Sequence, residues 1–257
     1  MSATERARHS LQIRDLAKAF SINGKRHTVF AEIGLDIDPG EFVAIVGESG
    51  SGKTTLLRII AGLERADAGS ITVGGRPVEG VGSERGMVFQ EPRLLPWLTV
   101  QKNISLGLEL RRLPRPAIDR IVTELLDLVG LRGFASAYPS QLSGGMAQRV
   151  GIARALATNP EILLLDEPLG ALDAMTRMRM QAELERIWQE QRVTVIMVTH
   201  DIEEAVYLAD KVIVMASGRG GIGKVFPVPL LRPRDRSSTE FVTVREALLR
   251  EFHLSAH

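Results

Sequence analysis

The hydrophobic pattern of the chain consists of short apolar runs that alternate with helical patterns. Glu41–Val46 is a compact apolar run, and it leads through a glycine-rich turn into a helical pattern over Thr54–Ala61. Because such runs lie between helical patterns, we expect an α/β fold with a mostly parallel sheet covered by helices. The other predicted buried strands are Gly86–Phe89, Ile162–Leu165, Val193–Val198 and Lys211–Met215.

Two stretches depart from this alternation. Ser10–Ile37 has the pattern of strands joined by the polar turn Asn23-Gly24-Lys25, which predicts an N-terminal antiparallel β subdomain. Residues from about 98 to 157 show helical patterns only, which predicts an inserted α-helical subdomain. Its clearest apolar face is formed by Ile118, Ile121, Val122, Leu125, Leu126 and Val129.

The C-terminal part of the chain differs in composition from the rest. After residue 218 it is rich in Gly, Pro and Arg, and its one predicted helix covers Ser238–Phe252. We therefore expect one main domain over residues 10–218 and a short tail over residues 219–257. That tail is too short to form a second folded domain.

The composition excludes several classes of protein. The 257 residues include 32 Lys and Arg against 31 Asp and Glu, a net charge of +1, which argues against a nucleic-acid partner. There is no cysteine, which excludes disulfides, thiolate metal sites and cysteine nucleophiles. The first residues show no secretory signal, and no apolar run is long enough to span a membrane. We expect a protein that is not embedded in a membrane.

The segment Gly47-Glu48-Ser49-Gly50-Ser51-Gly52-Lys53-Thr54 fits the phosphate-loop pattern G-x-x-x-x-G-K-[ST]. Its glycines let backbone N–H groups turn toward a phosphate, and the positive end of the next helix adds to the attraction. Lys53 is then expected to reach the β- and γ-phosphates, and the Thr54 hydroxyl to ligate Mg²⁺. The alternative is a plain glycine turn with a surface lysine. The flanking strand and helix favour a P-loop NTPase that binds ATP and Mg²⁺.

Polar residues follow three of the predicted strands. Asp166 and Glu167 come after Ile162–Leu165, at the strand end where ligands sit in parallel sheets. Asp166 is suited to hold Mg²⁺, and Glu167 to deprotonate an attacking water. His200 could contact the γ-phosphate or the water, and the Gln90 amide could contact Mg²⁺ or the water. The alternatives are a solvated strand end, a structural histidine and a polar surface residue.

A second possible anion site lies in the segment LSGGMAQRVGIARAL. Ser143, Gly144 and Gly145 stand directly before an apolar helical pattern, so the backbone N–H groups of that helix start could bind an anion. The alternative is an ordinary capped helix with Ser143 as its N-cap. A second anion-binding helix start makes sense if it serves the nucleotide of a partner molecule.

In order and spacing these segments resemble the ATP-binding-cassette (ABC) ATPases over nearly the whole chain. The resemblance implies ATP hydrolysis coupled to transmembrane transport. It also implies that Phe20 stacks on adenine, although the family's usual residue there is tyrosine and a core position is the alternative. The matching segments are the phosphate loop Gly47–Thr55 with Thr55 included, the Q-loop at Gln90, the signature Leu142–Met146, the Asp-Glu strand Ile162–Pro168, the D-loop Ala171-Leu172-Asp173 and the switch histidine His200.

The resemblance further implies that two subunits pair head to tail as a homodimer. The ATP on the phosphate loop of one subunit then meets Ser143, Gly144 and Gly145 of the other, with Asp173 nearby. Such ATPases act on integral membrane permease subunits from the cytoplasmic face of the bacterial inner membrane. In the family, the region of Glu91–Leu98 helps to form the groove for a permease helix; the alternative is that its apolar residues only seal the helical subdomain.

Several segments narrow the resemblance to one group of importers. EPRLLPW, LSGGMAQRVGIARAL, THDIEEAVYLAD and LLRPRDRSSTEF are similar to ATPase subunits of importers for nitrate, sulfonates and taurine. Aliphatic sulfonates are the first expectation, delivered by a periplasmic solute-binding protein. The rival interpretations are an exporter ATPase, a non-transport ABC ATPase and a nucleotide-binding scaffold without hydrolysis. The presence of Lys53, Asp166, Glu167 and His200 argues against the scaffold.

Overall fold

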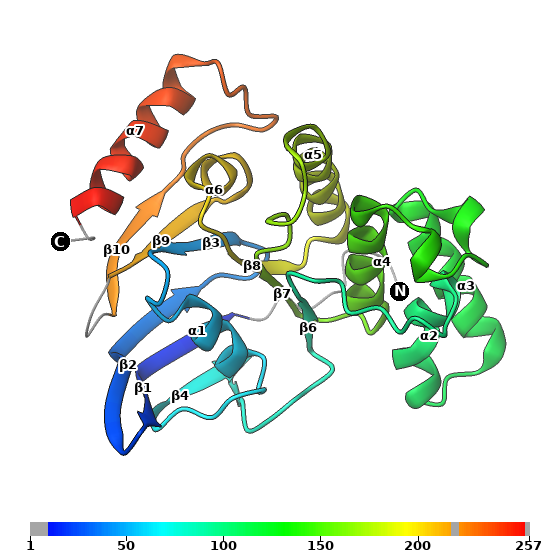
Figure 1. Cartoon of the computed structure of the whole chain (residues 1–257), viewed down its shortest axis with the longest axis horizontal. Coiled ribbons are helices and arrows are strands. Elements are labelled where there is room, and N and C mark those ends of the chain that lie inside the picture. The colour runs from blue at the N-terminus through cyan, green and yellow to red at the C-terminus, as the bar shows by residue number, and fades with distance from the viewer. Residues whose placement is uncertain (1–9, 217–220, 255–257) are drawn as a thin grey trace. The chain divides into compact units, whose positions relative to one another are not determined.

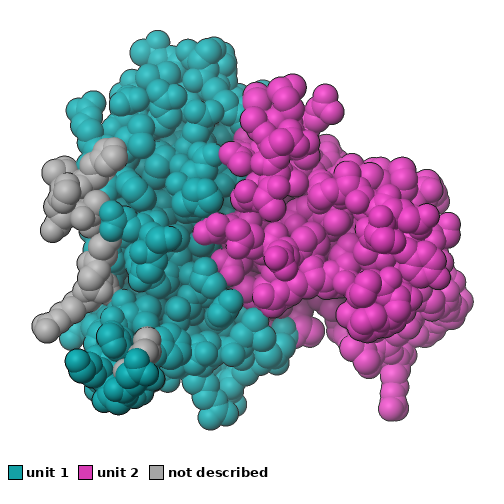
Figure 2. All heavy atoms as spheres, viewed as in Figure 1, with its two compact units in different colours: residues 1–82, 193–257 teal, residues 83–192 magenta. Residues whose placement is uncertain are grey.

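The computed structural model describes residues 10–216 and 221–254. The chain divides into two compact units (Figure 2): unit 1 comprises residues 1–82 and 193–257, and unit 2 comprises residues 83–192. Across the two described ranges, no helix combines the length and the apolar character needed to cross a lipid bilayer.

Unit 1 begins with an antiparallel sheet of strand order β2-β1-β4-β5, of which Figure 1 labels β2, β1 and β4. The strands β1 (Leu11–Ile22) and β2 (Lys25–Ile37) form a hairpin, and the predicted polar turn is confirmed, with Asn23 and Gly24 both at positive φ. The strands β4 (Ala68–Val73) and β5 (Arg76–Pro77) complete the sheet. The sequence pattern did not predict these two strands.

A second set of strands in unit 1 is mostly parallel. β3 (Phe42–Gly47) pairs in parallel with both β8 (Thr194–Val198) and β9 (Lys211–Met215), and almost every residue of the three strands is buried. Such full burial explains why these strands are continuous apolar runs in the sequence. The helices of unit 1 are α1 (Lys53–Ile60), α6 (Ile202–Leu208) and α7 (Thr239–Leu254).

The C-terminal tail contributes a strand as well as the expected helix. β10 (Ile222–Pro227) pairs antiparallel with β9 and lies at the edge of the strand order. It lies beyond residue 218, the expected end of the main domain. The residues of β10 are exposed or half-buried, so the strand lacks the apolar signal of its buried neighbours.

Unit 2 combines a parallel strand pair with helices. β6 (Arg85–Val88) pairs in parallel with β7 (Ile162–Asp166). The helices α2 (Val100–Leu110), α3 (Arg115–Leu128) and α4 (Gly144–Ala157) fill the segment predicted to be helical, and α5 (Ala174–Gln191) follows β7. Short 3₁₀ turns cover Arg132–Phe134 and Pro139–Gln141. The predicted fold class, an α/β protein with an antiparallel N-terminal sheet and inserted helices, is confirmed.

Candidate functional site

The phosphate-loop segment of unit 1 is built so tightly that its first glycine admits no side chain. Gly47 ends β3, and a Cβ there would lie 2.8 Å from the Ser51 Oγ and 2.9 Å from the Met215 carbonyl oxygen. Gly50 has a φ of 84°, which side chains adopt at a cost. The loop therefore folds back on itself directly at the end of the strand.

The last glycine of the loop brings the start of α1 against the hairpin. Gly52 is the N-cap residue of α1 with a φ of 93°, and it provides no side chain to cap the helix. A Cβ there would lie 2.6 Å from the Val29 Cγ1 and 3.0 Å from the Phe30 Cδ1, both on β2. The positive end of the α1 dipole thus opens directly onto the loop.

Lys53 places a cation in the middle of this loop. The side chain is buried, and its Nζ donates to the carbonyl oxygens of Gly47 at 2.7 Å and Glu48 at 2.8 Å, with the Ser51 Oγ at 3.5 Å. Because a buried ammonium is costly unless it is paired, these loop carbonyls hold it in place. A buried cation surrounded by turned backbone at a helix start has the chemistry of a site for a phosphate chain, and it fits a nucleoside triphosphate.

Strand register brings His200 to the same edge of the sheet as the phosphate loop. Ile45 of β3 is paired with Val198 of β8, and the Thr199 N–H donates to the Ile45 carbonyl at 3.2 Å. Two residues further along each strand the chain reaches Gly47 and His200. His200 is exposed, so its imidazole is accessible beside the loop.

Buried polar residues on both sides of His200 hold its backbone. The Thr199 hydroxyl donates a short hydrogen bond to the Glu204 carboxylate and accepts from the Asp201 N–H at 3.1 Å. The Asp201 carboxylate caps α6 by accepting from the Glu204 N–H at 3.1 Å. Thr199 and Glu204 are 2% and 3% exposed, so this network is shielded from water. The sequence analysis did not single out these residues.

Phe20 lies on the same hairpin that contacts the loop. It stands on β1 opposite His27 of β2, the strand that packs on Gly52. Phe20 is 38% exposed, and the Lys18 Nζ lies 4.8 Å from its ring centroid. The exposure argues against the alternative of a core residue and leaves an aromatic surface for a flat ligand.

In unit 2, the acidic pair follows β7 as expected. Asp166 is its last residue and is 7% exposed. Glu167 has a φ of 45°, in the left-handed region that non-glycine residues adopt only at an energetic cost. The structure keeps a strained glutamate directly after a buried strand, which is a known mark of functional positions.

The structure also brings Gln90 and Glu167 together. A Cβ at Gly170 would lie 3.6 Å from the Gln90 Nε2 and 3.6 Å from the Glu167 Oε2, so both side-chain ends approach the same small space. Gly170 also closes a turn by donating its N–H to the Glu167 carbonyl at 3.2 Å. Any side chain at Gly170 would contact both groups.

Two polar side chains of α4 hold the backbone on either side of Gln90. The Arg154 guanidinium donates to the carbonyl oxygens of Pro92 at 2.7 Å and Arg93 at 2.9 Å, and the Gln148 amide donates to the Phe89 carbonyl at 3.4 Å. Burial lowers the pKa of Arg154 below its ordinary value. Neither side chain belongs to a motif recognised in the sequence, although a polar residue within a largely buried helix is a signal for such a role.

The start of α4 gives different functions to its two glycines. Ser143 is the N-cap, and its hydroxyl accepts from the Met146 N–H at 3.3 Å, as the simple capping interpretation expects. Gly144 is exposed, whereas Gly145 is buried, and a Cβ on Gly145 would lie 3.0 Å from the Thr176 Cγ2 of α5. Gly145 therefore also permits the close contact of α4 with α5.

Asp173 caps α5 in the same manner. Its carboxylate accepts from the Thr176 N–H at 3.0 Å. Hydrogen bonds from the Thr176 hydroxyl and backbone hold the pKa of Asp173 below its ordinary value. Asp173 is exposed, so capping leaves the carboxylate accessible to other groups.

The predicted site residues are divided between the two units. Unit 1 holds Phe20, the loop residues 47–55 and His200, and unit 2 holds Gln90, residues 143–145, Asp166, Glu167 and Asp173. Within the described residues, no group of three or more His, Asp or Glu side chains is arranged to hold a metal ion. A metal with several phosphate and water ligands needs fewer protein groups than that.

Comparisons with known proteins give a consistent family. A family model described as "ABC transporter" matches residues 30–170. An uncharacterized ABC transporter ATP-binding protein of Methanocaldococcus jannaschii, MJ0412, is 48% identical over 95% of this chain and 92% of its own length. The aliphatic sulfonates import ATP-binding protein SsuB of Bacillus licheniformis is 48% identical over 95% of this chain and 94% of its length, and that of Bacillus subtilis is 48% identical over 91% of each.

A solved structure extends the similarity to the fold. The ATP-binding cassette MJ0796, described as a dimer in a post-hydrolysis state bound to ADP and Pi, is 31% identical. It covers 86% of this chain and 100% of its own, with a TM-score of 0.75. This chain belongs to the ABC transporter family and is an ATP-binding, ATP-hydrolysing subunit of that family.

Proposed function

We propose that this chain powers the import of aliphatic sulfonates, with taurine and nitrate as the next candidate solutes. The observation that carries the proposal is the 48% identity, over nearly the full length of both chains, to two proteins named aliphatic sulfonates import ATP-binding protein SsuB. ATPase subunits do not contact the transported solute, so the proposal depends on the similarity of the whole chain to importer subunits rather than on any one residue.

The proposed nucleotide site begins with unit 1. Phe20 would stack on the adenine, and the N–H groups of residues 47–55 would surround the phosphates. Lys53 would exchange its bonds to the Gly47 and Glu48 carbonyls for phosphate oxygens, because an anion competes well for an ammonium held by neutral carbonyls. Lys53 would thereby change partners on binding without moving far.

The donor groups of three predicted residues would suit a magnesium ion on the phosphates. The Thr54 hydroxyl, the Asp166 carboxylate and the Gln90 amide are oxygen ligands of the kind that Mg²⁺ prefers. When bound, Mg²⁺ would neutralise charge on the phosphate oxygens. The buried Asp166 is well suited to this, since a carboxylate with little water around it gains from a cation partner.

Hydrolysis would use the polar residues after the strands. Glu167 would accept the proton of the attacking water, and its strained backbone supports a functional role at this position. General-base help of this kind is worth roughly 10²–10⁴ in rate. His200 and Gln90 would contact the γ-phosphate or orient the water.

A second copy of the chain would complete each site. Ser143, Gly144 and Gly145 of one copy would contact the ATP on the other, with Asp173 beside them. Gly144 and Ser143 are exposed and therefore available for such a contact. The dimeric cassette MJ0796 gives a precedent for pairing between relatives of this chain.

The work would pass to integral membrane permease subunits through residues 91–98. Trp97 is 70% exposed, so sealing the helical part of unit 2 does not account for it. Asn103 holds the backbone beneath it: its amide accepts from the Leu95 N–H and donates to the Leu95 and Leu98 carbonyls. The chain would sit peripherally on the cytoplasmic face of the inner membrane, and a periplasmic binding protein would supply the solute.

Deletion of the gene in its host tests the proposed cargo. We expect growth to fail with an alkanesulfonate as the sole sulfur source, while growth on sulfate continues. A plasmid copy should restore growth, and a copy with Glu167→Gln should not. If growth failed only on taurine, or only with nitrate as nitrogen source, the solute would be reassigned accordingly. Undiminished growth on the alkanesulfonate, taurine and nitrate would refute the proposal.

A further inference from the structure

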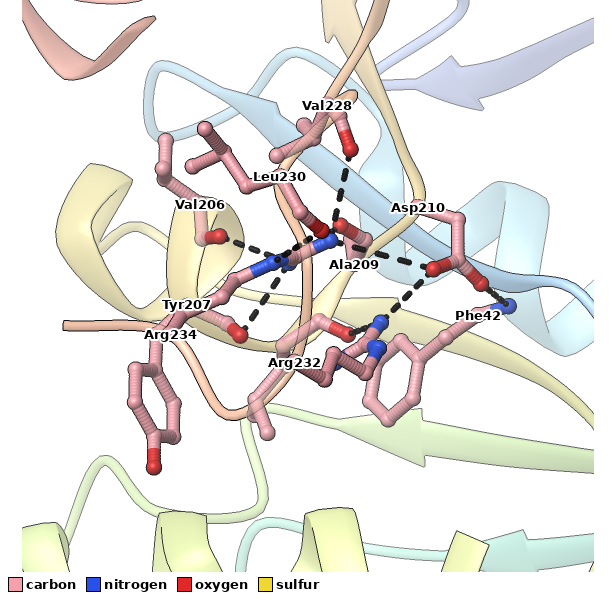
Figure 3. Close-up of polar contacts among 10 residues, drawn as sticks. Phe42, Val206, Tyr207, Ala209, Asp210, Val228, Leu230, Arg232 and Arg234 are labelled. Carbon is pink, nitrogen blue, oxygen red and sulfur yellow. Dashed lines mark hydrogen bonds and ion pairs between the residues drawn. The ribbon is translucent and has the colours of Figure 1, made fainter. Parts of the chain in front are cut away.

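The C-terminal tail contains an arginine whose side chain is almost completely enclosed by backbone carbonyls (Figure 3). The Arg234 side chain is 1% exposed. Its Nη1 donates to the carbonyl oxygens of Val206 at 2.8 Å, Tyr207 at 3.1 Å and Ala209 at 2.6 Å. Its Nε and Nη2 donate to Leu230 at 3.4 Å and Val228 at 3.3 Å, within the tail itself. One guanidinium thus joins the tail to the end of α6.

A second tail arginine adds to this attachment at the C-terminal end of α6. The Arg232 Nη2 donates to the Leu208 carbonyl and to the Asp210 carboxylate, both at 2.7 Å. The other oxygen of Asp210 accepts from the Phe42 N–H, at the start of β3, at 3.0 Å (Figure 3). We name Arg232, Arg234 and Asp210 the tail clamp.

The tail clamp compensates for a weakness of α6. This helix has only seven residues, and such a short helix is marginal by itself. Its last carbonyls lack partners within the helix, and its last turn carries no basic side chain. The two tail arginines donate to those carbonyls and place positive charge at the negative end of the helix dipole.

The first turn of α6 is linked to His200. Asp201 caps the helix, and Thr199 joins the residues before and after His200 to Glu204. Backbone hydrogen bonds of α6 connect this turn to the tail clamp: the Ala209 N–H donates to the Ala205 carbonyl at 2.9 Å, and the Ala205 N–H to the Asp201 carbonyl at 3.1 Å. A change in the last turn of α6 should therefore move His200.

We propose that Arg234, assisted by Arg232, is a positioning residue for His200, so that the tail sets the efficiency of ATP hydrolysis without contacting the nucleotide. The inference rests on the proposed function of His200. It gives the C-terminal segment a catalytic purpose that neither the strand β10 nor the helix α7 explains. Lys53 is held by the carbonyls of its own loop, at the opposite end of β3 from the Asp210–Phe42 bond, so nucleotide affinity should not depend on the two arginines.

The test uses Arg234→Met in the full chain, with Arg232→Met as a milder second variant. We expect Arg234→Met to lower kcat by at least about tenfold through displacement of His200, with the dissociation constant for ATP changed less than about twofold. Arg234→Lys, which keeps the charge but fewer donors, should fall between parent and Met variant. Lys224→Met is the matched control, because it removes the exposed ion pair from Lys224 to Glu251 without touching α6; its kcat should equal that of the parent.

The position of His200 is followed by NMR of histidine Cε1–H groups in the protein without nucleotide, with the His200 signal assigned from His200→Gln. The His200 signal should shift or broaden in Arg234→Met and Arg232→Met, while the His27 signal stays in place. A lower kcat with an unchanged His200 signal, or an unchanged kcat, would overturn the inference. Addition of ATP to the parent gives the separate test: an unmoved His200 signal there would refute the proposed role of His200 but not its positioning by the clamp.

Discussion

The two glycine-rich helix starts, at α1 and at α4, look alike in the sequence but are built differently. At α1 the N-cap is Gly52 in the left-handed conformation, and the buried Lys53 is bonded to the loop's own carbonyls. At α4 the N-cap is Ser143, whose hydroxyl accepts from the Met146 N–H. The first has the geometry of a phosphate cradle, whereas the second is a capped helix start with Gly144 exposed, which we propose serves the nucleotide of a second copy.

The largest effects are expected from one substitution at each helix start: the one at α1 should weaken ATP binding, and the one at α4 should stop hydrolysis. Lys53→Ala should weaken ATP binding about 100-fold, because it removes a charge-assisted contact that contributes roughly 2.7 kcal/mol to the free energy of binding. Ser143→Arg should leave ATP binding by the monomer intact, yet stop hydrolysis by blocking the helix start that serves a second copy. Fluorescent nucleotide titration and a phosphate-release assay measure the two quantities.

A milder substitution at Ser143 controls for the loss of the N-cap hydrogen bond. Ser143→Ala removes only the hydroxyl, which should cost about 1 kcal/mol of stability and reduce hydrolysis far less than the arginine. If Ser143→Arg hydrolysed ATP at the parental rate, the helix start of α4 would have no nucleotide to serve. If Lys53→Ala kept parental affinity, the phosphate cradle of unit 1 would be wrongly placed.

Replacing a glycine by alanine should change the thermal midpoint by a smaller amount, and in opposite directions at the two helix starts. Gly52→Ala must adopt a positive φ and displace Val29 and Phe30, so the thermal midpoint should fall by at least about 5 °C. Gly144→Ala meets only the Leu172 Cδ2 at 3.6 Å in a helical conformation, so the midpoint should rise by up to about 2 °C. Differential scanning fluorimetry measures both.

Gly75→Ala is the matched control for the backbone conformation alone. Gly75 has a φ of 76°, but a Cβ there would meet nothing within 4 Å. A loss at Gly75 as large as that at Gly52 would show that the contact with β2 contributes nothing. A loss at Gly144 equal to that at Gly52 would remove the distinction between the two helix starts.

The same comparison explains what the sequence could predict. The phosphate loop was predictable because its own glycines and Lys53 determine its conformation. The position of His200 next to it also followed, because apolar strands that alternate with helices place their carboxyl ends at one edge. Local residues determine the loop, whereas the position of His200 follows from the regular strand arrangement that the apolar pattern predicts.

Other features depended on contacts between segments far apart in the chain. Arg154 and Arg234 donate to carbonyls 61 or 62 and 25 to 28 residues away, and no spacing in the sequence marks such partners. Gly145 was expected to contact a nucleotide, yet its burial against Thr176 could be known only once α4 and α5 were packed. The strand β10 was missed because an exposed edge strand lacks a continuous apolar run.

The smallest expected effect concerns Asp173, whose hydrogen bonds fix Thr176 next to Gly145. Its pKa is lowered in the folded chain by the Thr176 hydroxyl and backbone, so its cap stabilises the fold above the unfolded pKa of about 3.9. That contribution to stability should be lost as the pH falls through the lower pKa of the folded chain.

An NMR titration of the Asp173 carboxyl carbon measures this pKa directly, and Thr176→Val should bring it back toward the ordinary value by removing the hydroxyl. The Asp235 pKa, lowered by Ser237 instead, should not change in that variant. An Asp173 pKa at its ordinary value in the parent would mean that the cap is not formed, and the start of α4 would then lack the fixed neighbour that distinguishes Gly145 from Gly144.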